Sequence, residues 1–444
     1  MVVGRARWFM AAVAAVLATG LGAPPASADP VMLPTAADPS IIRDASGIYH
    51  AYATSDDWGD GKGMRFLPHW ISYDLQNWIY SGNVFSGMPG WVVNGQTAWA
   101  PQVLADGNRF LMYYAVGYPD NPCIGMASSP SLNGPWNDLG HPVFCAKDVG
   151  IAGTIDPFVW NDNGNKTIVV GNFGGVYAIP LNPDGSAAAG KPVQIADQRF
   201  EAPYIVKKDN NFYLFASAGN CCSGPTTAYR VLAGRSPNLF GPYVDRDGRD
   251  LNLGGGELVV AGSDKWAGPG HNAVTTDDAG HDWMLYHAIP RAQMNLPSGA
   301  PNRPAILDRL TWPGGWPKVG DGSPESTLPE QPIVNTPVHV NATVDGSRFV
   351  TRGAGRVEIV VTLTAPQNAG WSGKLWYGSE APGQLPAPED ITLKPGERTE
   401  RRISVDLPGA NNVVYSVYAY AGADDKHVVD AGVANIQSTG GGRG

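Results

Sequence analysis

The sequence predicts an all-β protein in which a five-bladed β-propeller is followed by a small C-terminal β-sandwich. Three observations indicate this class: short runs rich in aromatic and β-branched residues, a turn signal before each run, and a proline-containing element that recurs before most runs. No long segment has helical periodicity with caps. At 444 residues the chain is long enough for two or more domains.

Strand-like runs recur between residues 30 and 320. Each follows a turn signal such as Asp-Ala-Ser-Gly, and their spacing of about 45–70 residues is the size of one four-stranded propeller blade. The runs are GIYHAYAT (47–54), RFLMYYAVG (109–117), KTIVVGNF (166–173), NFYLFASA (211–218) and DWMLYHAI (282–289).

A second element precedes these runs, in which a proline is followed by apolar residues that lead into a hairpin. Four copies are ADPSII, WAPQVL, IDPFVW and EAPYIV, and a fifth, PGHNAV, has a histidine where the others have an acid or alanine. Five copies predict five blades, which we assign to residues 29–320. Residues 321–336 are rich in Pro, Ser and Glu and predict a linker.

Apolar and polar residues alternate with period two in several runs beyond the linker, which favours a β-sandwich over residues 337–438. We expect residues 439–444, which end in GGGRG, to be disordered.

The N-terminus is typical of a secretory signal peptide over residues 1–28. Arg5 and Arg7 precede an apolar stretch, residues 8–21, which is too short to span a bilayer, and Ala26-Ser27-Ala28 forms a small-x-small cleavage site. The alternative is a membrane anchor. We expect a mature chain that begins near Asp29 and is secreted to the extracellular space without a membrane attachment.

Charge and cysteine content narrow the function classes. Charged residues make up 16% of the chain, the net charge is −9, and no basic run is visible, which excludes a nucleic-acid partner.

Export permits disulfides. Local pairing joins Cys123 to Cys145 and leaves a vicinal Cys221–Cys222 bridge, with free buried thiols as the alternative. We expect a monomer.

Three acids of the repeated element are candidates for catalysis. The innermost strand of every propeller blade starts near the central channel, so Asp38, Asp156 and Glu201 converge on one pocket. Gathered carboxylates raise one another's pKa, which yields one protonated acid and one ionised base, as glycoside hydrolysis requires. The alternative is that each Asp-Pro or Glu-Ala-Pro is a structural turn.

Aromatic residues and a histidine add to this pocket. Trp99 lies in the channel-facing element and Phe173 in a predicted loop, where their rings would stack on sugar C–H faces; core packing is the alternative for Phe173. His271, in the fifth copy, would bind a metal or hydrogen-bond the carboxylates. His287, in the same blade, is interpreted as packing.

The order of these motifs resembles that of the family 43 glycoside hydrolases, and within them the arabinan endo-1,5-α-L-arabinanases. The similarity covers most of residues 30–320 and is strongest over residues 200–319, which contain FEAPYIV, CCSG, AYRVLAGRS, GPGHNAV and LTWPGGWP. The resemblance implies a five-bladed propeller that cleaves α-L-arabinofuranosidic linkages, in 1,5-arabinan above all, with inversion of configuration.

The resemblance also implies roles for individual residues. Asp38 matches the general base that activates water, Glu201 the general acid, and Asp156 the residue that orients Glu201 and tunes its pKa. Inversion needs the acid and base about 6.5–9.5 Å apart. His271 matches the ligand of a calcium or sodium ion in the channel, held mostly through waters.

Two departures from the family pattern keep the substrate open. Gln102 stands where the arabinanases have Asp, and the loop that contains Asn172 and Phe173, which lines the sugar site, lacks the usual tryptophan. An exo-acting arabinofuranosidase, a β-xylosidase or a galactofuranosidase therefore remains an alternative, as does a non-catalytic carbohydrate-binding propeller.

Overall fold

The computed structural model describes residues 30–117, 120–324, 331–409 and 412–439. The predicted signal peptide and residues 440–444 of the predicted tail lie outside these ranges. Within them, helix is confined to α1 (Ala146–Val149) and three 3-10 turns (Gly224–Thr226, Leu251–Leu253, Pro313–Gly315). None of these helices is long and apolar enough to cross a membrane. The prediction of an all-β fold is confirmed.

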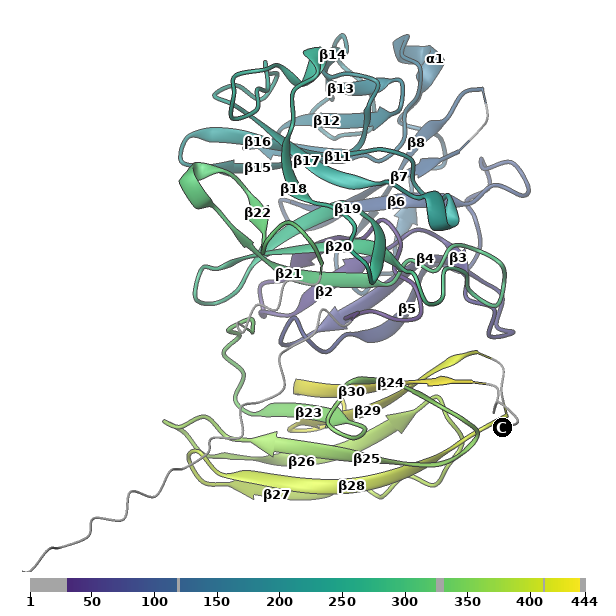
Figure 1. The fold of residues 1–444 in the computed structure, drawn as a ribbon, viewed down its shortest axis with the longest axis vertical. Helices are drawn as coiled ribbons and strands as arrows, with labels where there is room; N and C mark the ends of the chain where they lie inside the picture. The colour runs from purple at the N-terminus through teal and green to yellow at the C-terminus, as the bar shows by residue number, and fades with distance from the viewer. Residues whose placement is uncertain (1–29, 118–119, 325–330, 410–411, 440–444) are drawn as a thin grey trace, which may run out of the picture.

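The first part of the chain forms five antiparallel sheets, each built from strands that are consecutive in sequence (Figure 1). The first sheet contains β1 (Ser40–Arg43), β2 (Tyr49–Tyr52), β3 (Asp56–Asp57), β4 (Met64–Ser72) and β5 (Ile79–Phe85). The second contains β6 (Ala98–Asp106), β7 (Arg109–Val116), β8 (Cys123–Ser129), β9 (Asn137–Asp138) and β10 (Phe144–Cys145).

The next three sheets have four strands each. The third contains β11 (Phe158–Asp162), β12 (Asn165–Asn172), β13 (Gly175–Pro180) and β14 (Val193–Ala196). The fourth contains β15 (Phe200–Lys208), β16 (Asn211–Ala218), β17 (Arg230–Ser236) and β18 (Glu257–Val260). The fifth contains β19 (Trp266–Thr276), β20 (Asp282–Pro290), β21 (Ala305–Thr311) and β22 (Lys318–Val319).

The sheets form a closed ring. The first strand of each sheet contacts the first strand of the next, and β19 returns to contact β1. This is the arrangement of a β-propeller. The five strand-like runs predicted from the sequence are the second strands of these sheets, namely β2, β7, β12, β16 and β20.

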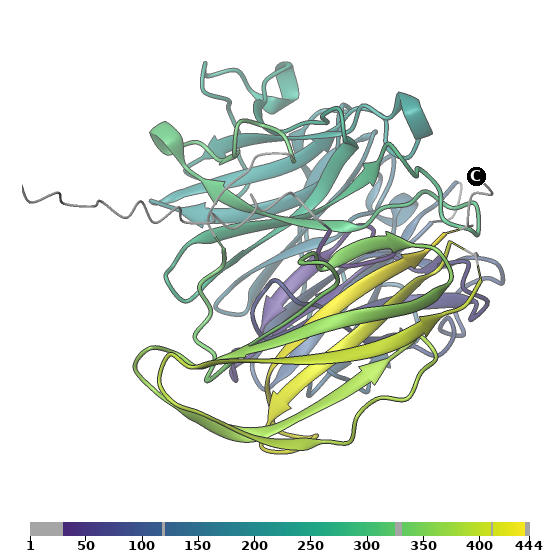
Figure 2. The same ribbon diagram turned by 60° about the horizontal axis from the view of Figure 1, so that its bottom comes forward.

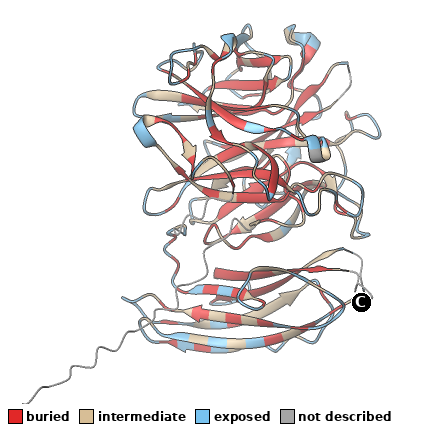
Figure 3. Cartoon of the chain, viewed as in Figure 1, coloured by how far each residue is buried: buried red, intermediate tan, exposed pale blue. Residues whose placement is uncertain are grey.

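Apolar clusters between neighbouring sheets hold the ring together. Each of five clusters combines side chains from two adjacent sheets, so that Phe215 and Trp266 join the fourth sheet to the fifth, and Trp70 and Trp283 join the first to the fifth. Figure 3 shows buried residues running through all of these sheets. Burial of such large side chains contributes roughly 1.5–3 kcal/mol each.

The C-terminal part contains two further sheets that share one apolar cluster. The three-stranded sheet contains β23 (His339–Thr343), β25 (Gly355–Thr364) and β28 (Arg398–Leu407). The five-stranded sheet contains β24 (Phe349–Arg352), β30 (Val428–Ser438), β29 (Val414–Gly422), β26 (Trp371–Ser379) and β27 (Glu389–Leu393). Period-two burial along β25 matches the alternation in the sequence.

These sheets pack against the first sheet of the ring (Figures 1 and 2). Ile79 of β5 lies in one cluster with Tyr418 and Val433, and the backbone N–H of Val433 donates to Oδ1 of Asn77 at 3.1 Å. The described part of the predicted linker, residues 331–336, also contacts the ring. The Ile333 N–H donates to Oδ2 of Asp277, in the turn between β19 and β20, at 3.0 Å.

The structure joins the four cysteines in two pairs, Cys123–Cys145 and Cys221–Cys222. The first links β8 to β10, while the second lies in the loop between β16 and β17.

Candidate active site

A residue with a left-handed backbone stands at the same point of each of the five sheets, where the first strand begins or bends. The φ angles are 53° at Asp38, 48° at Ala100, 54° at Asp156, 52° at Ala202 and 50° at His271. Non-glycine residues rarely adopt positive φ, and those that do cluster at functional sites. The element predicted from the sequence therefore repeats one backbone conformation in all five sheets, and His271 is the residue that adopts it in the fifth.

The left-handed residue creates a β-bulge. In β15, Glu201 pairs with Ser217 and Tyr204 with Phe215, so three steps on β15 match two on β16. The same skip occurs in β6 and β19. Bulges re-aim the side chains beside them. The acids are therefore offset by one position, because Asp38 and Asp156 are the left-handed residues whereas Glu201 comes directly before one.

Backbone amides of four left-handed residues tie neighbouring sheets together. Each donates to a side chain of the adjacent sheet: Ala100 to Thr54 Oγ1 (2.9 Å), Ala202 to Asp156 Oδ2 (3.1 Å), His271 to Ser217 Oγ (2.9 Å) and Asp38 to His287 Nδ1 (3.1 Å). The last bond joins the first sheet to the fifth. The inner strands thereby bring residues distant in sequence into one polar cluster.

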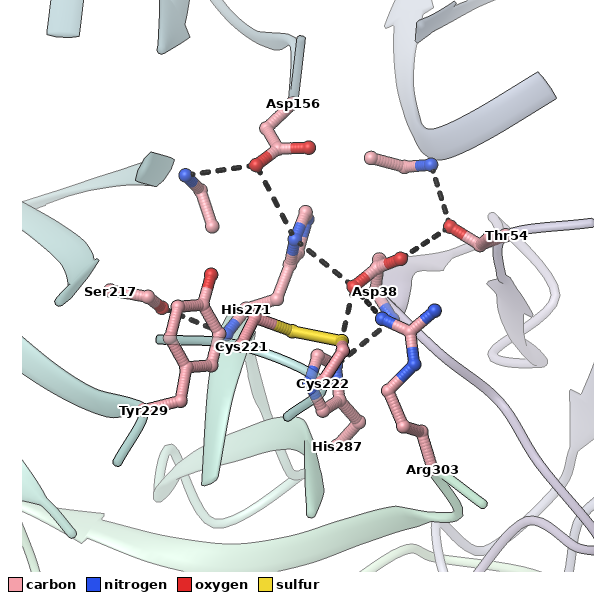
Figure 4. A network of polar contacts seen from close by, with 12 residues as sticks. Asp38, Thr54, Asp156, Ser217, Cys221, Cys222, Tyr229, His271, His287 and Arg303 are labelled. Atoms are coloured by element: carbon pink, nitrogen blue, oxygen red, sulfur yellow. Dashed lines mark hydrogen bonds and ion pairs between the residues drawn. A yellow bond between two sulfur atoms is a disulfide. The ribbon is translucent and has the colours of Figure 1, made fainter. Parts of the chain in front are cut away.

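Asp38 is surrounded by positive and hydrogen-bonding groups (Figure 4). Nη1 of Arg303 lies 2.8 Å from Oδ1, and Thr54 donates to Oδ2 at 2.5 Å. Nδ1 of His287 and of His271 lie 3.3 and 3.5 Å from Oδ1. Burial alone would raise the pKa of Asp38, but Arg303, the two histidines and the Thr54 hydrogen bond hold it well below its usual value. Asp38 is therefore ionised at neutral pH.

The pKa of Glu201, unlike that of Asp38, lies above its usual value. The residue is 9% exposed, and its carboxyl accepts a hydrogen bond from the Tyr229 hydroxyl at 2.7 Å. Burial raises the pKa of Glu201 to about 7, with the Tyr229 bond lowering it and the charge of Asp38 raising it. Burial and the charge of Glu201 also raise the pKa of Asp156 well above its usual value. The cluster therefore holds a proton on a carboxyl near neutral pH.

His271 lies between the acids, with Nδ1 3.5 Å from Asp38 and 3.9 Å from Asp156. Burial lowers the pKa of His271, which leaves the imidazole neutral. Calcium takes six to eight oxygen ligands, yet the described residues contain no group of three or more His, Cys, Asp or Glu side chains placed to hold a metal ion. His271 therefore stays the predicted ligand of a bound ion, with water supplying most of the shell.

The three residues predicted to contact substrate have local partners of their own. The ring of Trp99 covers Gly117, where an added Cβ would meet ring atoms at 2.0 Å. Oδ1 of Asn172 accepts the Gly174 N–H at 2.9 Å, and Phe173 is 45% exposed. Within the described ranges, no hydrogen bond or ion pair joins these side chains to the three acids. Their role in binding stays a prediction.

Sequence reasoning missed several members of the cluster. His287, interpreted as packing, accepts the backbone N–H of Asp38. A signal existed, because Thr54, Ser217 and His287 are polar residues at the same point near the end of three of the strand-like runs. Arg303 and Tyr229 belong to no repeat; Tyr229 lies in the AYRVLAGRS segment of the family resemblance, but no pattern in the sequence indicates that it contacts Glu201.

The site belongs to a region with known relatives. The model of the glycosyl hydrolases family 43 matches residues 27–317, which is more than half of the chain and includes every residue of the cluster.

Named relatives are similar over the same region. An extracellular exo-α-(1→5)-L-arabinofuranosidase of Cellvibrio japonicus is 31% identical over 59% of this chain and 82% of its own length. An extracellular endo-α-(1→5)-L-arabinanase of Bacillus subtilis is 28% identical over 63% and 86%. The structure of a Cellvibrio cellulosa α-L-arabinanase complexed with arabinohexaose covers 66% of this chain and 96% of its own, with 28% identity and a TM-score of 0.56. The chain therefore belongs to the glycosyl hydrolases family 43 and is a glycoside hydrolase.

Proposed function

We propose that this glycoside hydrolase cleaves α-1,5-linked L-arabinofuranosyl bonds of arabinan with inversion of configuration, outside the cell. The observation that carries the proposal is the contrast between two carboxyls in one cluster: Asp38 lies 2.8 Å from the Arg303 guanidinium, whereas Glu201 is buried against the neutral Tyr229 hydroxyl, and burial raises its pKa to about 7. Relatives named as extracellular arabinan-cleaving enzymes support the substrate and the secretion.

The proposed reaction is a single displacement. Asp38 takes a proton from water, whose oxygen attacks the anomeric carbon on the side opposite the leaving sugar. The glycosidic C–O bond breaks as Glu201 gives its proton to the leaving oxygen. Asp156 accepts the N–H of Ala202 and so orients the residue beside Glu201. Trp99, Asn172 and Phe173 would contact the sugar.

The remaining assignments concern the whole chain. We propose a five-bladed propeller in which each sheet of the ring is one blade, spanning residues 29–320, a linker at 321–336 and a β-sandwich at 337–438. Residues 1–28 would be removed on secretion, the mature protein would be a monomer, and a calcium or sodium ion would sit beside His271. No step of the reaction is routed through that ion.

Hydrolysis of debranched arabinan tests the proposal. The wild-type protein should release arabinose or arabino-oligosaccharides, and Glu201→Gln should lose about 10²- to 10⁴-fold in rate. Mixed oligomers early in the reaction mean endo action, and monomer alone means the exo action of the Cellvibrio japonicus relative. If the wild type cleaves no furanoside polymer or aryl glycoside, a carbohydrate-binding role replaces the hydrolytic one.

A further inference from the structure

Tyr229 is a buried side chain in direct contact with the proposed general acid. It is 2% exposed, and its hydroxyl lies 2.7 Å from Oε1 of Glu201. The residue stands between the Cys221–Cys222 loop and β17, next to Ser217 at the base of that loop (Figure 4).

The backbone of β19 is shaped to admit the Tyr229 ring. A Cβ on Gly270 would lie 2.1 Å from Cδ1 of Tyr229, so any other residue at this position would displace the ring. Gly270 pairs with His287 as Glu201 pairs with Ser217, and it therefore occupies the position of Glu201 in the fifth sheet. The fifth sheet leaves open the space through which Tyr229 reaches the acid.

Tyr229 donates to Oε1 of Glu201. The neighbouring Ser217 Oγ already accepts the backbone N–H of His271 at 2.9 Å. Among the described residues, Oε1 of Glu201 is the acceptor within hydrogen-bond distance of the phenolic oxygen, so the phenolic hydrogen is directed at Oε1. Oε1 acts as an acceptor, so a proton carried by Glu201 resides on Oε2.

We propose that Tyr229 is a positioning residue for the general acid, which holds the transferable proton of Glu201 on Oε2 by donating to Oε1. This inference rests on the proposed function, in which Glu201 protonates the leaving oxygen. Without the donor, the proton would divide between both oxygens, and the oxygen facing the substrate would carry it less often.

Other groups around the carboxyl do not replace this donor. Asp38 is ionised and only accepts, Asp156 is bonded to the Ala202 N–H, and Arg303 is engaged with Asp38. Of the two neighbouring histidines, His271 meets Ser217 through its backbone N–H and His287 stacks on Tyr229 with ring centroids 6.0 Å apart. Burial lowers the pKa of both histidines, so neither supplies a charged donor, and among the described residues no hydrogen bond joins either ring to Glu201.

Tyr229→Phe tests the proposal, with Tyr243→Phe as the matched control. Tyr243 is fully buried in the same sheet region, and its hydroxyl donates to the Leu239 carbonyl at 2.9 Å, away from the acids. For arabino-oligosaccharides, whose leaving sugar needs a proton, kcat/KM should fall about 10-fold or more. For 4-nitrophenyl α-L-arabinofuranoside, whose leaving group needs little assistance, the loss should stay below about threefold. An equal loss on both substrates, or none, overturns the proposal.

Infrared titration gives a readout that does not depend on activity. The carboxyl C=O band that disappears in Glu201→Gln reports the protonated Glu201. In Tyr229→Phe this band should move to higher frequency, because its carbonyl oxygen loses a hydrogen bond, and its titration midpoint should rise. An unchanged band and midpoint overturn the proposal. If the wild type hydrolyses nothing, the proposed function fails, while the infrared result still shows whether Tyr229 donates a hydrogen bond to Glu201.

Discussion

The guanidinium of Arg303 lies 2.8 Å from Oδ1 of Asp38, although 265 positions separate the two residues in the chain. Asp38 directly precedes the first sheet and Arg303 directly precedes β21 of the fifth, so closure of the ring brings them together. The pair sets the ionised state of the proposed base, and because both side chains are only 13% exposed, loss of either partner would leave an uncompensated buried charge.

Replacement of Arg303 should shift the acidic limb of the pH profile. Arg303→Gln removes the nearest positive charge, so the pKa of Asp38 rises and the acidic limb of kcat/KM moves to higher pH. We expect kcat to fall roughly 10- to 100-fold as the carboxylate loses its orientation. Arg303→Lys, which keeps the charge, should shift the limb less. If the acidic limb of Arg303→Gln stayed at the wild-type pH, the group that titrates in that limb would not be Asp38.

Glu201→Gln should stabilise the protein at alkaline pH. Glu201 stays protonated in the fold up to about pH 7, whereas the unfolded chain ionises it near 4.5. Unfolding therefore releases a proton between these values, and stability falls as pH rises through this window. Because glutamine does not ionise, the variant avoids this loss, and we expect its unfolding free energy to exceed that of the wild type by up to about 3 kcal/mol above pH 7 and not at all below pH 4. Melting scans at both pH values, with the exposed Glu400→Gln as control, measure it; a gain of equal size at both contradicts the raised pKa.

The Cys123–Cys145 bridge should act on stability and leave catalysis intact. It joins β8 to β10 across a sequence separation of 22, and no residue of the catalytic cluster belongs to either strand. The double variant with alanine at both positions should lose about 2–4 kcal/mol of unfolding free energy with kcat unchanged. The corresponding variant of Cys221 and Cys222, which enclose no loop, should lower the melting temperature far less.

Asn77 should fasten the C-terminal sheets to the first sheet. Its Oδ1 accepts the Val433 N–H at 3.1 Å, and its Nδ2 donates to Asp74 at 2.6 Å, with the side chain 4% exposed. Asn77→Ala leaves two buried polar groups unpaired, so we expect a loss of about 1–3 kcal/mol. Asn83→Ala, at an exposed position of β5, is the control. Equal melting temperatures for the two variants would argue against a tight interface.

The strand pattern and the three acids could be predicted from the sequence, whereas the contacts that shift the pKa values of these acids could not. Turn signals and aromatic runs predicted the second strand of every sheet because these strands are buried and bounded by glycine or asparagine turns. The Asp-Pro copies marked the sites where the backbone turns left-handed, yet periodicity does not reveal that Glu201 is offset by one residue. Arg303 and Tyr229 reach the acids from connecting loops, and only ring closure and the space left by Gly270 bring them there.

In the proposed mechanism, Asp38 activates water for direct attack while Glu201 protonates the leaving sugar. Proton NMR of the first product formed from an α-1,5-linked arabino-oligosaccharide distinguishes this single displacement from a double one. The prediction is that the β-anomer of the new reducing end appears first and the α-anomer follows by mutarotation. Release of the α-anomer first would mean a double displacement through a carboxylate nucleophile and would contradict the role assigned to Asp38.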